Sequence, residues 1–570
     1  MEFQPKWWEE APPQGTYRSI FKWGDPNKFK HPNKRLYKLM RDEFGMTDQD
    51  FETPQKLGLE KVEFNIPLKL DSAHLEALKH IVGKENIKTD DYSRLSASYG
   101  KTMLDLMRLR EGIVENVPDA VVFPRDKNDV AEILRYCNQH HIAIYPRGGG
   151  STVTRGVECI SGGICLDLTK HMNRILKLNE TNQTVTVEPG IYGPALENAL
   201  RNAQQMFGAS RAYTCGHLPQ SFEYSTVGGW VVTRGAGQNS TYYGKIEDLV
   251  VCQEYVTPVG VIATKEYPRA ALGPSIDQIM IGSEGTFGVL VSVTLKIFRY
   301  MPENDQRFSF VFKDYHSALE ATREIMQSEA GYPSVMRLSD PEETDVAMKL
   351  YGVEGTIIDA AMSARGYKRM QRCLLLGVAQ GEKTFARNVK RNIMRVAHKY
   401  GGMYTTGYVA KSWEHGRFTD PYMREDLQDY GIIIDTLECA VAWDQIENVW
   451  SGVRAFCKSR PHTIVMSHSS HFYPQGTNLY FIFVGKFKDI NEYVEYQSGI
   501  LDSIVKYGAA LSHHHGIGKM FAPWLESSIG KNQIEVLRAL KKHFDPNNIM
   551  NPGGTLGLDL PNDRKRTYES

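Results

Sequence analysis

Three consecutive histidines stand before a glycine-containing turn in the stretch SHHHGIGK, residues 512–519. Imidazole titrates near neutral pH and is also a common metal ligand. The cluster of His513, His514 and His515 is therefore consistent with a proton-handling site, with metal ligands, or with a solvated turn. Three imidazoles so close together should not all be protonated at neutral pH, because like charges lower each pKa. At least one of them is then free to accept a proton.

Four stretches rich in glycine and hydroxyl residues precede the histidines. They are YPRGGGST (145–152), QSFEYSTVGGWVVTRGAG (220–237), YYGKIEDLVV (242–251) and IGSEGTFGVLVSVTLKI (281–297). Glycine lets main-chain N–H groups approach a ligand closely, which suits a pyrophosphate. Each stretch alone would indicate a tight turn, but four in one region favour a cofactor site. The G-x-G-x-x-G and Walker lysine patterns do not occur in this sequence, which disfavours a Rossmann or kinase-type loop.

Expected strands and helices place these loops. AVVF (120–123) and IAIYP (142–146) flank NDVAEILRYCNQHH (128–141), which predicts strand, helix, strand, with Asn128 as the helix cap. Further strands are expected in 163–168, 183–190, 248–260 and 288–298, and a helix in 192–203. After residue 300, amphipathic helices at 314–327 and 382–402 alternate with strands at 373–381 and 479–487. The pattern predicts an α+β second domain, followed by a last helix and turn in 534–554.

Composition and length limit the kind of protein that this chain can be. Lys+Arg and Asp+Glu balance at 67 each, which argues against nucleic acid as a partner. The eight cysteines are scattered without a C-x-x-C pair, as expected for reduced core thiols of an intracellular protein. With 570 residues, the chain should divide into two or three domains.

We identify no targeting signal at either end of the given sequence. MEFQPKWWEEAPPQG lacks the pattern of a signal peptide, and DRKRTYES does not end in a peroxisomal tripeptide. No apolar run reaches the length of a membrane span. We therefore expect a cytoplasmic protein that can contact a membrane peripherally, with the N-terminal region helping either this contact or a homodimer.

The motifs resemble a known superfamily. PRGGGST, QSFEYSTVGGW, TRGAG, GSEGTFG and the closing FDPNNIMNPG are similar to those of FAD-binding oxidoreductases of the vanillyl-alcohol-oxidase type, from about residue 90 to 555. SVMRLSD, RFTDPYMREDLQDYGIIIDTLECAVAWD and NLYFIF followed by SHHHGIGK narrow the resemblance to the alkyldihydroxyacetonephosphate synthase family. The resemblance implies an α+β fold, with a vanillyl-alcohol-oxidase/p-cresol-methylhydroxylase-type FAD-binding domain and an α+β substrate cap domain.

The expected domain boundaries follow from the resemblance and the element pattern. They are a mostly helical N-terminal region at 1–90, the FAD-binding domain at 91–300, the cap domain at 301–510, and a C-terminal segment at 511–570 that returns the histidines to the FAD domain.

The resemblance also implies the residues that hold the cofactor. They are Pro146, Arg147, Gly148, Gly149, Gly150, Ser151, Thr152, Gln220, Ser221, Glu223, Ser225, Thr226, Gly229, Thr233, Arg234, Gly235, Ala236, Gly282, Glu284, Gly285, Thr286 and Gly288. The RGGGST loop has no histidine at the position where some relatives attach their flavin covalently. We therefore expect non-covalent FAD.

The implied activity is a substitution without net oxidation. An acyl-dihydroxyacetonephosphate exchanges its acyl group for a fatty alcohol through an adduct at flavin N5, which forms an ether-lipid precursor. The resemblance assigns Tyr480 and the three histidines to catalysis, and Arg337 and Arg424 to the substrate. If LSHHHG is extended, His513 and His515 share one face and His514 the other.

Two features leave alternatives open. His468 and His471 lie near the expected site, so a metal is conceivable, but we rank it below proton transfer and assign no metal ligand. The first alternative activity is an FAD-dependent dehydrogenase or oxidase of a 2-hydroxy acid on the same fold; such relatives usually carry EHGIG where this chain has HHGIG, and a GDGNxH segment that is absent here. The second is a flavoprotein that binds a ligand without turnover, which the intact set of acid, base and arginine residues disfavours.

Overall fold

The computed structural model describes residues 10–566. The predictions made above from MEFQPKWWEEAPPQG and DRKRTYES concern segments that lie partly outside these described residues. Within it, no helix combines the length and apolar character that crossing a membrane requires.

The first half of the chain builds two small sheets. A four-stranded sheet has the order β1 (Ile87–Lys88), β2 (Ala120–Val122), β4 (Ile164–Asp167), β3 (Ile144–Arg147). Strands β2, β4 and β3 run parallel, and α7 (Lys127–His140) connects β2 to β3. The cap of α7 is Asp126, whose carboxylate accepts the N–H groups of residues 128 and 129. The expected cap, Asn128, is therefore wrong by two positions, since Asp126 already satisfies these first-turn donors.

The second sheet is antiparallel. Its order is β5 (Ile175–Asn179), β6 (Thr184–Val187), β10 (Val289–Lys296), β8 (Val250–Thr257), β9 (Gly260–Ala263). Around it lie α8 (Gly193–Arg201), α9 (Ala203–Phe207), α10 (Val227–Val232), α11 (Ser240–Tyr243), α12 (Ile246–Leu249) and α13 (Ile276–Met280), with the short pair β7 (Tyr213–Thr214) and β11 (Phe298–Arg299).

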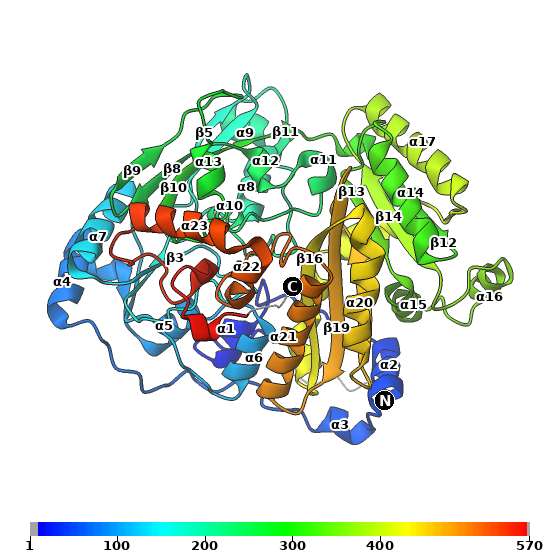
Figure 1. The fold of residues 1–570 in the computed structure, drawn as a ribbon, viewed down its shortest axis with the longest axis horizontal. Helices are drawn as coiled ribbons and strands as arrows, with labels where there is room; N and C mark the ends of the chain where they lie inside the picture. The colour runs from blue at the N-terminus through cyan, green and yellow to red at the C-terminus, as the bar shows by residue number, and fades with distance from the viewer. Residues whose placement is uncertain (1–9, 567–570) are drawn as a thin grey trace.

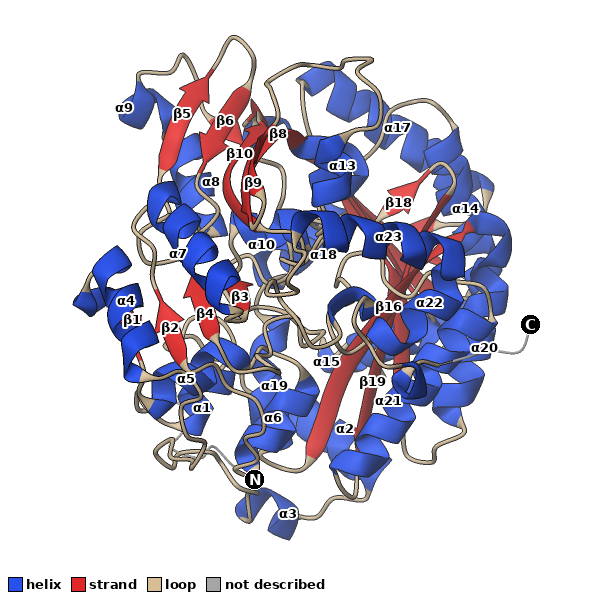
Figure 2. Ribbon diagram, turned by 60° about the vertical axis from the view of Figure 1, so that its left-hand side comes forward, coloured by secondary structure: helices blue, strands red, loops and turns tan. Residues whose placement is uncertain are grey.

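A large antiparallel sheet forms the second half. Its order is β15 (Met403–Tyr404), β12 (Gln306–Phe312), β14 (Cys373–Ala379), β13 (Val335–Ser339), β17 (Ile464–Ser469), β19 (Gly476–Lys486), β16 (Ile432–Ala442), with β18 (Phe472–Tyr473) beside β19. Helices α14 (Tyr315–Gln327), α17 (Lys383–Lys399), α20 (Ile446–Lys458) and α21 (Ile490–Lys506) pack against it. Figure 2 shows the two small sheets on one side of the molecule and β16 and β19 on the other.

Alternation along β19 separates core from site. Leu479, Phe481 and Phe483 are fully buried in the apolar core, whereas Tyr480 and Ile482 face the opposite side and line a cavity. The core itself is continuous between the two halves of the chain. The shared core therefore joins the large sheet to the small sheets, with Tyr480 and Ile482 on the cavity side.

The N-terminal region packs across both halves. It contains α1 (Tyr17–Phe21), α2 (Lys34–Phe44), α3 (Asp48–Glu52) and α4 (Ser72–Val82), separated by long irregular segments, so it is helical only in part. Buried Arg18 pairs with Asp429 at 2.9 Å, and Arg110 joins the same carboxylate at 2.7 Å. Arg18 lies on α1, and Arg110 is the last residue of α6 (Met103–Arg110). Helix α5 (Asp91–Ser98) precedes α6 in the chain.

The end of the chain returns to the first sheet. Helices α22 (Ala522–Ile529) and α23 (Lys531–Phe544) follow the histidines, and Met550 then forms a parallel bridge with Ile144 of β3. The eight cysteines are free, and all but Cys252 are buried, which confirms the expected core thiols. The remaining helices are α15 (Pro341–Leu350), α16 (Ile357–Ala364), α18 (Gly407–Gly416) and α19 (Met423–Gln428).

Candidate functional site

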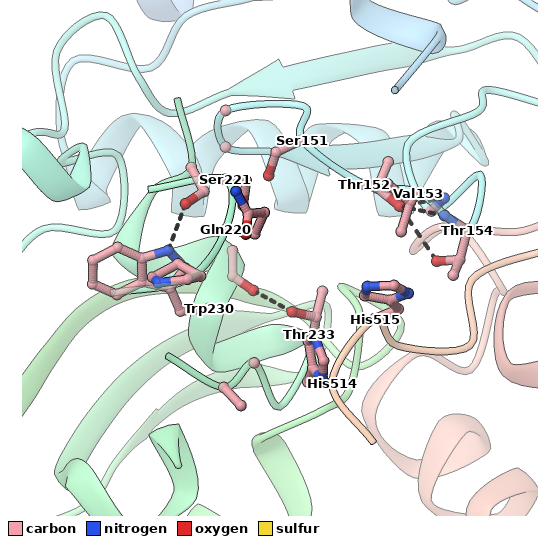
Figure 3. Close-up of a pocket in the computed structure, with 18 of the residues that line it drawn as sticks. Ser151, Thr152, Val153, Thr154, Gln220, Ser221, Trp230, Thr233, His514 and His515 are labelled. Carbon is pink, nitrogen blue, oxygen red and sulfur yellow. Dashed lines mark hydrogen bonds between the residues drawn. The ribbon is translucent and has the colours of Figure 1, made fainter. Parts of the chain in front are cut away.

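A cavity of about 370 Å³ lies between the small sheets and the large sheet. The loop after β3, the loop before α10 and the turn before β10 form one wall. Residues of β13, β16, β17 and β19 and the histidine loop form the other. Figure 3 shows His514 and His515 on one side of this cavity and Ser151, Gln220 and Ser221 on the other. The sequence motifs thus converge on one space.

The expected cofactor residues line this cavity with four exceptions, which are Glu223, Arg234, Gly282 and Thr286. The Glu223 carboxylate instead accepts hydrogen bonds from Lys28 and the Tyr422 hydroxyl. The guanidinium of Arg234 donates to Gln278 at 3.3 Å, away from the cavity. These two side chains stabilise the surrounding loops.

The geometry of the glycine loops fits a bound dinucleotide. A Cβ atom at Gly149 would come within 2.0 Å of the Tyr224 carbonyl oxygen, so only glycine lets the first two loops pack together here. A Cβ at Gly229 would meet only Thr226 Oγ1 at 3.5 Å, so a side chain there would extend into open space at the cavity wall. Buried Arg147 Nε and Gln238 Oε1 have no partner among the described residues. Narrow backbone walls and unpaired polar atoms suit a flat, phosphate-bearing group such as FAD.

Glu438 on β16 holds the histidine loop. Its fully buried carboxylate accepts the main-chain N–H groups of His513, His514 and His515 at 2.8–3.0 Å, and the Ser512 hydroxyl at 2.7 Å. The loop therefore curls around one carboxylate. The expected extended alternation is wrong, because three successive N–H groups converge on a single acceptor instead of pointing alternately.

A second buried carboxylate holds the other end of the loop. Glu284, from the turn before β10, accepts the N–H groups of Ile517 and Gly518, both at 2.7 Å. Burial raises the pKa of Glu284 to about 7, although the two N–H donors act in the opposite direction. The loop is thus clamped between the large sheet, through Glu438, and the small sheets, through Glu284.

Tyr480 and His515 form a hydrogen-bonded pair at the cavity wall, with Oη and Nε2 2.9 Å apart. Burial raises the pKa of the Tyr480 phenol well above its ordinary value and lowers the pKa of His515. Both groups are therefore neutral at pH 7, so the phenol keeps its proton and the imidazole can accept one. This is the charge state that a general acid and its partner require.

The ring of His468 packs against Tyr480. The two rings are stacked, with centroids 4.9 Å apart and planes 15° apart. Arg337 contacts both ring nitrogens of His468 at 3.0 and 3.1 Å and donates to Glu343 at 2.6 Å. Burial would raise the pKa of Glu343, but Arg337 and His468 bring it to about 2. Arg337 lines the cavity, and part of its guanidinium is committed to this charged support.

Arg424 has more free hydrogen-bond donors for an anion than Arg337. Its Nη1 donates to the Lys101 carbonyl oxygen at 2.7 Å, while its buried Nε and Nη2 have no partner among the described residues. The guanidinium lies 4.6 Å from the centre of the Trp23 ring, and both side chains line the cavity.

His513 does not line the cavity, unlike His514 and His515. Its Nε2 shares a hydrogen bond with the Tyr473 hydroxyl at 2.7 Å, and its Nδ1 lies 3.0 Å from that of His514. One nitrogen each of His471, His513 and His514 lie within 4.8 Å of one another, so these three could hold a metal ion. Burial lowers the pKa of all three well below 6.5, which favours neutral imidazoles.

Sequence reasoning missed three residues at this site. Glu438 clamps the histidines, and Asp435 lines the cavity with a carboxylate that accepts the Tyr493 hydroxyl at 2.6 Å. His217 also lines the cavity, is 0% exposed, and has no hydrogen-bond partner on either ring nitrogen among the described residues. Glu438 and Asp435 lie in a stretch singled out as IIIDTLECAVAWD, but their spacing carries no motif; His217 in TCGHLP carries none either.

We predict that burial of His217 costs the protein stability in acid, beginning near pH 6.5. Burial lowers the pKa of His217 to about 3, so the folded state keeps this imidazole neutral while the unfolded chain binds a proton below 6.5. The unfolded state then takes up more protons, and each such histidine costs about 1.4 kcal/mol of unfolding free energy at pH 5.5. Urea unfolding of the FAD-loaded protein at pH 7 and 5.5 measures the loss. His217→Phe should lose about 1 kcal/mol less than the unaltered protein; an equal loss would contradict the assignment.

Two family models match the chain. The FAD binding domain model covers residues 118–265, and the model of the C-terminal domain of FAD linked oxidases covers residues 301–555. Together they account for most of the chain and agree with the division between the small sheets and the large sheet.

The relatives of similar sequence carry names of different kinds. Alkyldihydroxyacetonephosphate synthase of Dictyostelium discoideum is 28% identical, over 93% of this chain and 92% of its own length. The uncharacterized FAD-linked oxidoreductase YgcU of Escherichia coli K12 is 31% identical, over 85% and 98%. Glycolate oxidase subunit GlcD of Bacillus subtilis is 26% identical, over 86% and 97%.

Solved structures share the fold. An alkyldihydroxyacetonephosphate synthase superposes with a TM-score of 0.79 at 27% identity, covering 94% of this chain and 98% of that one. p-Cresol methylhydroxylase with substrate bound superposes with a TM-score of 0.63 at 17% identity, covering 87% and 99%. The expected α+β fold, with a p-cresol-methylhydroxylase-type FAD-binding domain, is confirmed.

Proposed function

This chain belongs to the FAD-linked oxidase family, and within it we propose that the protein is an alkyl transferase similar to alkyldihydroxyacetonephosphate synthase. In this reaction the bond between the substrate carbon and the carboxylate oxygen of acyl-dihydroxyacetonephosphate breaks, and the fatty acid leaves. The oxygen of a fatty alcohol bonds to the same carbon, and the alcohol loses its proton. No net oxidation occurs.

The observation that carries the proposal is the Tyr480–His515 pair, with His514 beside it, facing the glycine loops across one cavity. Non-covalent FAD would be held by those loops and would supply a nucleophilic ring nitrogen together with electron delocalisation. The chain itself must move protons. The neutral phenol of Tyr480 exchanges a proton at the reacting carbon through His515, and neutral His514 accepts the proton of the alcohol.

The basic residues of the cavity suit an anionic substrate. Arg424 offers two unpaired, buried nitrogens, and Arg337 adds a second guanidinium over the same space. Guanidinium groups bind phosphate in a bidentate manner. Val335, Ile434 and Ile482 line the cavity on the large sheet and provide an apolar surface for an alkyl chain.

A second candidate is a dehydrogenase of a 2-hydroxy acid, and the same arginines favour it because they would also bind a carboxylate. The two activities separate in one experiment. The FAD-loaded protein is incubated with palmitoyl-dihydroxyacetonephosphate and isotope-labelled hexadecanol, and products are resolved by mass spectrometry. We expect labelled ether and free palmitate in equal amounts. Absence of ether, with bleaching of the flavin by a 2-hydroxy acid, would instead establish the dehydrogenase.

Arg424→Met should weaken substrate binding and leave FAD binding intact. A hydrogen bond between charged partners contributes about 1.5–3 kcal/mol, so kcat/KM should fall about 10- to 100-fold, mainly through KM. Arg424→Lys keeps the charge and should recover part of the loss. Steady-state kinetics and the ratio of FAD to protein provide the two readouts. An unchanged KM in Arg424→Met would remove this residue from the substrate site.

A further inference from the structure

Helix α16 (Ile357–Ala364) presents apolar side chains to the outside. Ile357 is 89% exposed and Ile358 is 65% exposed, whereas the charged Asp359 faces inward. The Asp359 carboxylate pairs there with Arg372, which is fully buried, at 2.8 Å. A helix on the surface of a globular protein normally turns its apolar side inward. Helix α16 buries Met362 beside Asp359 but leaves its two isoleucines in solvent, so its largest apolar side chains face outward.

The segments flanking α16 continue this surface. Tyr351 before the helix is 70% exposed, and Met370 after it is 52% exposed. We call residues 349–372 the α16 lobe. Figure 1 places α16 at the outer edge of the molecule, beyond the helices that cover the large sheet.

The charge of the lobe is positive. Residues 349–372 contain five basic and two acidic side chains, but Lys349 and Arg369 pair with Asp345 and Arg372 is buried. Both acids are already engaged, Glu354 with Arg369 and Asp359 with Arg372. Arg365 and Lys368 are exposed and have no ion-pair partner within residues 10–566. An exposed apolar helix flanked by unpaired cations suits a negatively charged lipid interface.

We propose that the α16 lobe docks on an anionic phospholipid bilayer, with Ile357 and Ile358 inserted between the lipids. The proposal rests on the proposed function for its purpose, because that activity needs access to lipid substrates. The N-terminal region, where a membrane contact was expected, offers little apolar surface: its exposed large apolar side chains, among the described residues, are Leu59 and Leu68, both below 40% exposure. A symmetric contact between two copies of the lobe would bring its unpaired cations together, which disfavours a second chain as the occupant.

Vesicle binding tests the proposal directly. The FAD-loaded protein is sedimented with vesicles of phosphatidylcholine, either pure or containing phosphatidylglycerol. We expect binding to the anionic vesicles, and about a tenfold or greater loss of bound protein in Ile357→Asp/Ile358→Asp. Arg365→Glu/Lys368→Glu should reduce binding to the anionic vesicles. Leu272→Asp, at a side chain 77% exposed in another loop, is the matched control and should bind like the unaltered protein.

Three results of the sedimentation experiment would overturn the proposal. They are no sedimentation of the unaltered protein with anionic vesicles, equal binding by the isoleucine variant, or equal losses in that variant and in Leu272→Asp. A lower molecular mass of the isoleucine variant in light scattering would assign the lobe to a second copy and would also refute it. Because turnover of detergent-dispersed substrate should be unchanged in the isoleucine variant, failure here is distinguishable from failure of the transferase assignment.

Discussion

Tyr480→Phe is expected to lower kcat about a thousandfold while the protein keeps its FAD. A positioned acid–base group contributes about 10²- to 10⁴-fold to a rate, and this phenol is hydrogen-bonded to His515 at the cavity wall. Phenylalanine keeps the ring that stacks on His468, so the fold should persist. Product formation, the flavin absorbance spectrum and thermal unfolding measure the three quantities.

Tyr473→Phe is the matched control. Tyr473 also bonds to a histidine of the loop, His513, at 2.7 Å, but neither residue lines the cavity. We expect this variant to retain activity within about tenfold, because its hydroxyl orients a side chain and does not reach the reacting atoms. Equal losses in Tyr473→Phe and Tyr480→Phe would show that the phenols act only by holding the loop. Near-normal turnover in Tyr480→Phe would remove it from proton transfer.

Glu438→Gln should release the histidine loop and lower kcat about a hundredfold, with KM little changed. Glutamine offers one acceptor oxygen in place of two, and its NH₂ group would face main-chain N–H donors of His513–His515. Leaving buried donors unpaired costs about 1–3 kcal/mol each, so the unfolding temperature should also fall. Glu438 is thus a positioning residue, and the separation of kcat from KM distinguishes this role from general destabilisation.

Glu342→Gln provides the comparison. Glu342 is a buried carboxylate that accepts the Val465 N–H group at 3.1 Å and pairs with Arg454, but it does not line the cavity. Its variant should show a lower unfolding temperature with kcat retained. If kcat falls equally in both variants at matched stability, Glu438 has no specific role in positioning the histidines.

Local chemistry explains what could be predicted from sequence. Glycine runs predict close backbone approach, and Gly149 shows it, since any side chain would collide with the neighbouring loop. Amphipathic spacing placed the long helices α14 and α17 correctly. The prediction that the loops, Tyr480 and the histidines meet at one site came from the resemblance of these motifs to a superfamily. In the structure, all but His513 line one cavity. The resemblance carries long-range information which spacing alone lacks.

The sequence by itself determined the types of group at the site, their turns and most of the elements that carry them. Only the tertiary structure decided which carboxylates hold the loop, because the register of β16 on β19 sets Glu438 opposite Tyr480, and 75 residues of chain separate it from His513. The tertiary structure also decided that His217 is buried at the cavity and that the isoleucines of α16 face solvent. Both outcomes depend on which distant residues pack against these side chains. Local patterns encode backbone preference and hydrophobic period, whereas partners distant in sequence are chosen by packing and strand register.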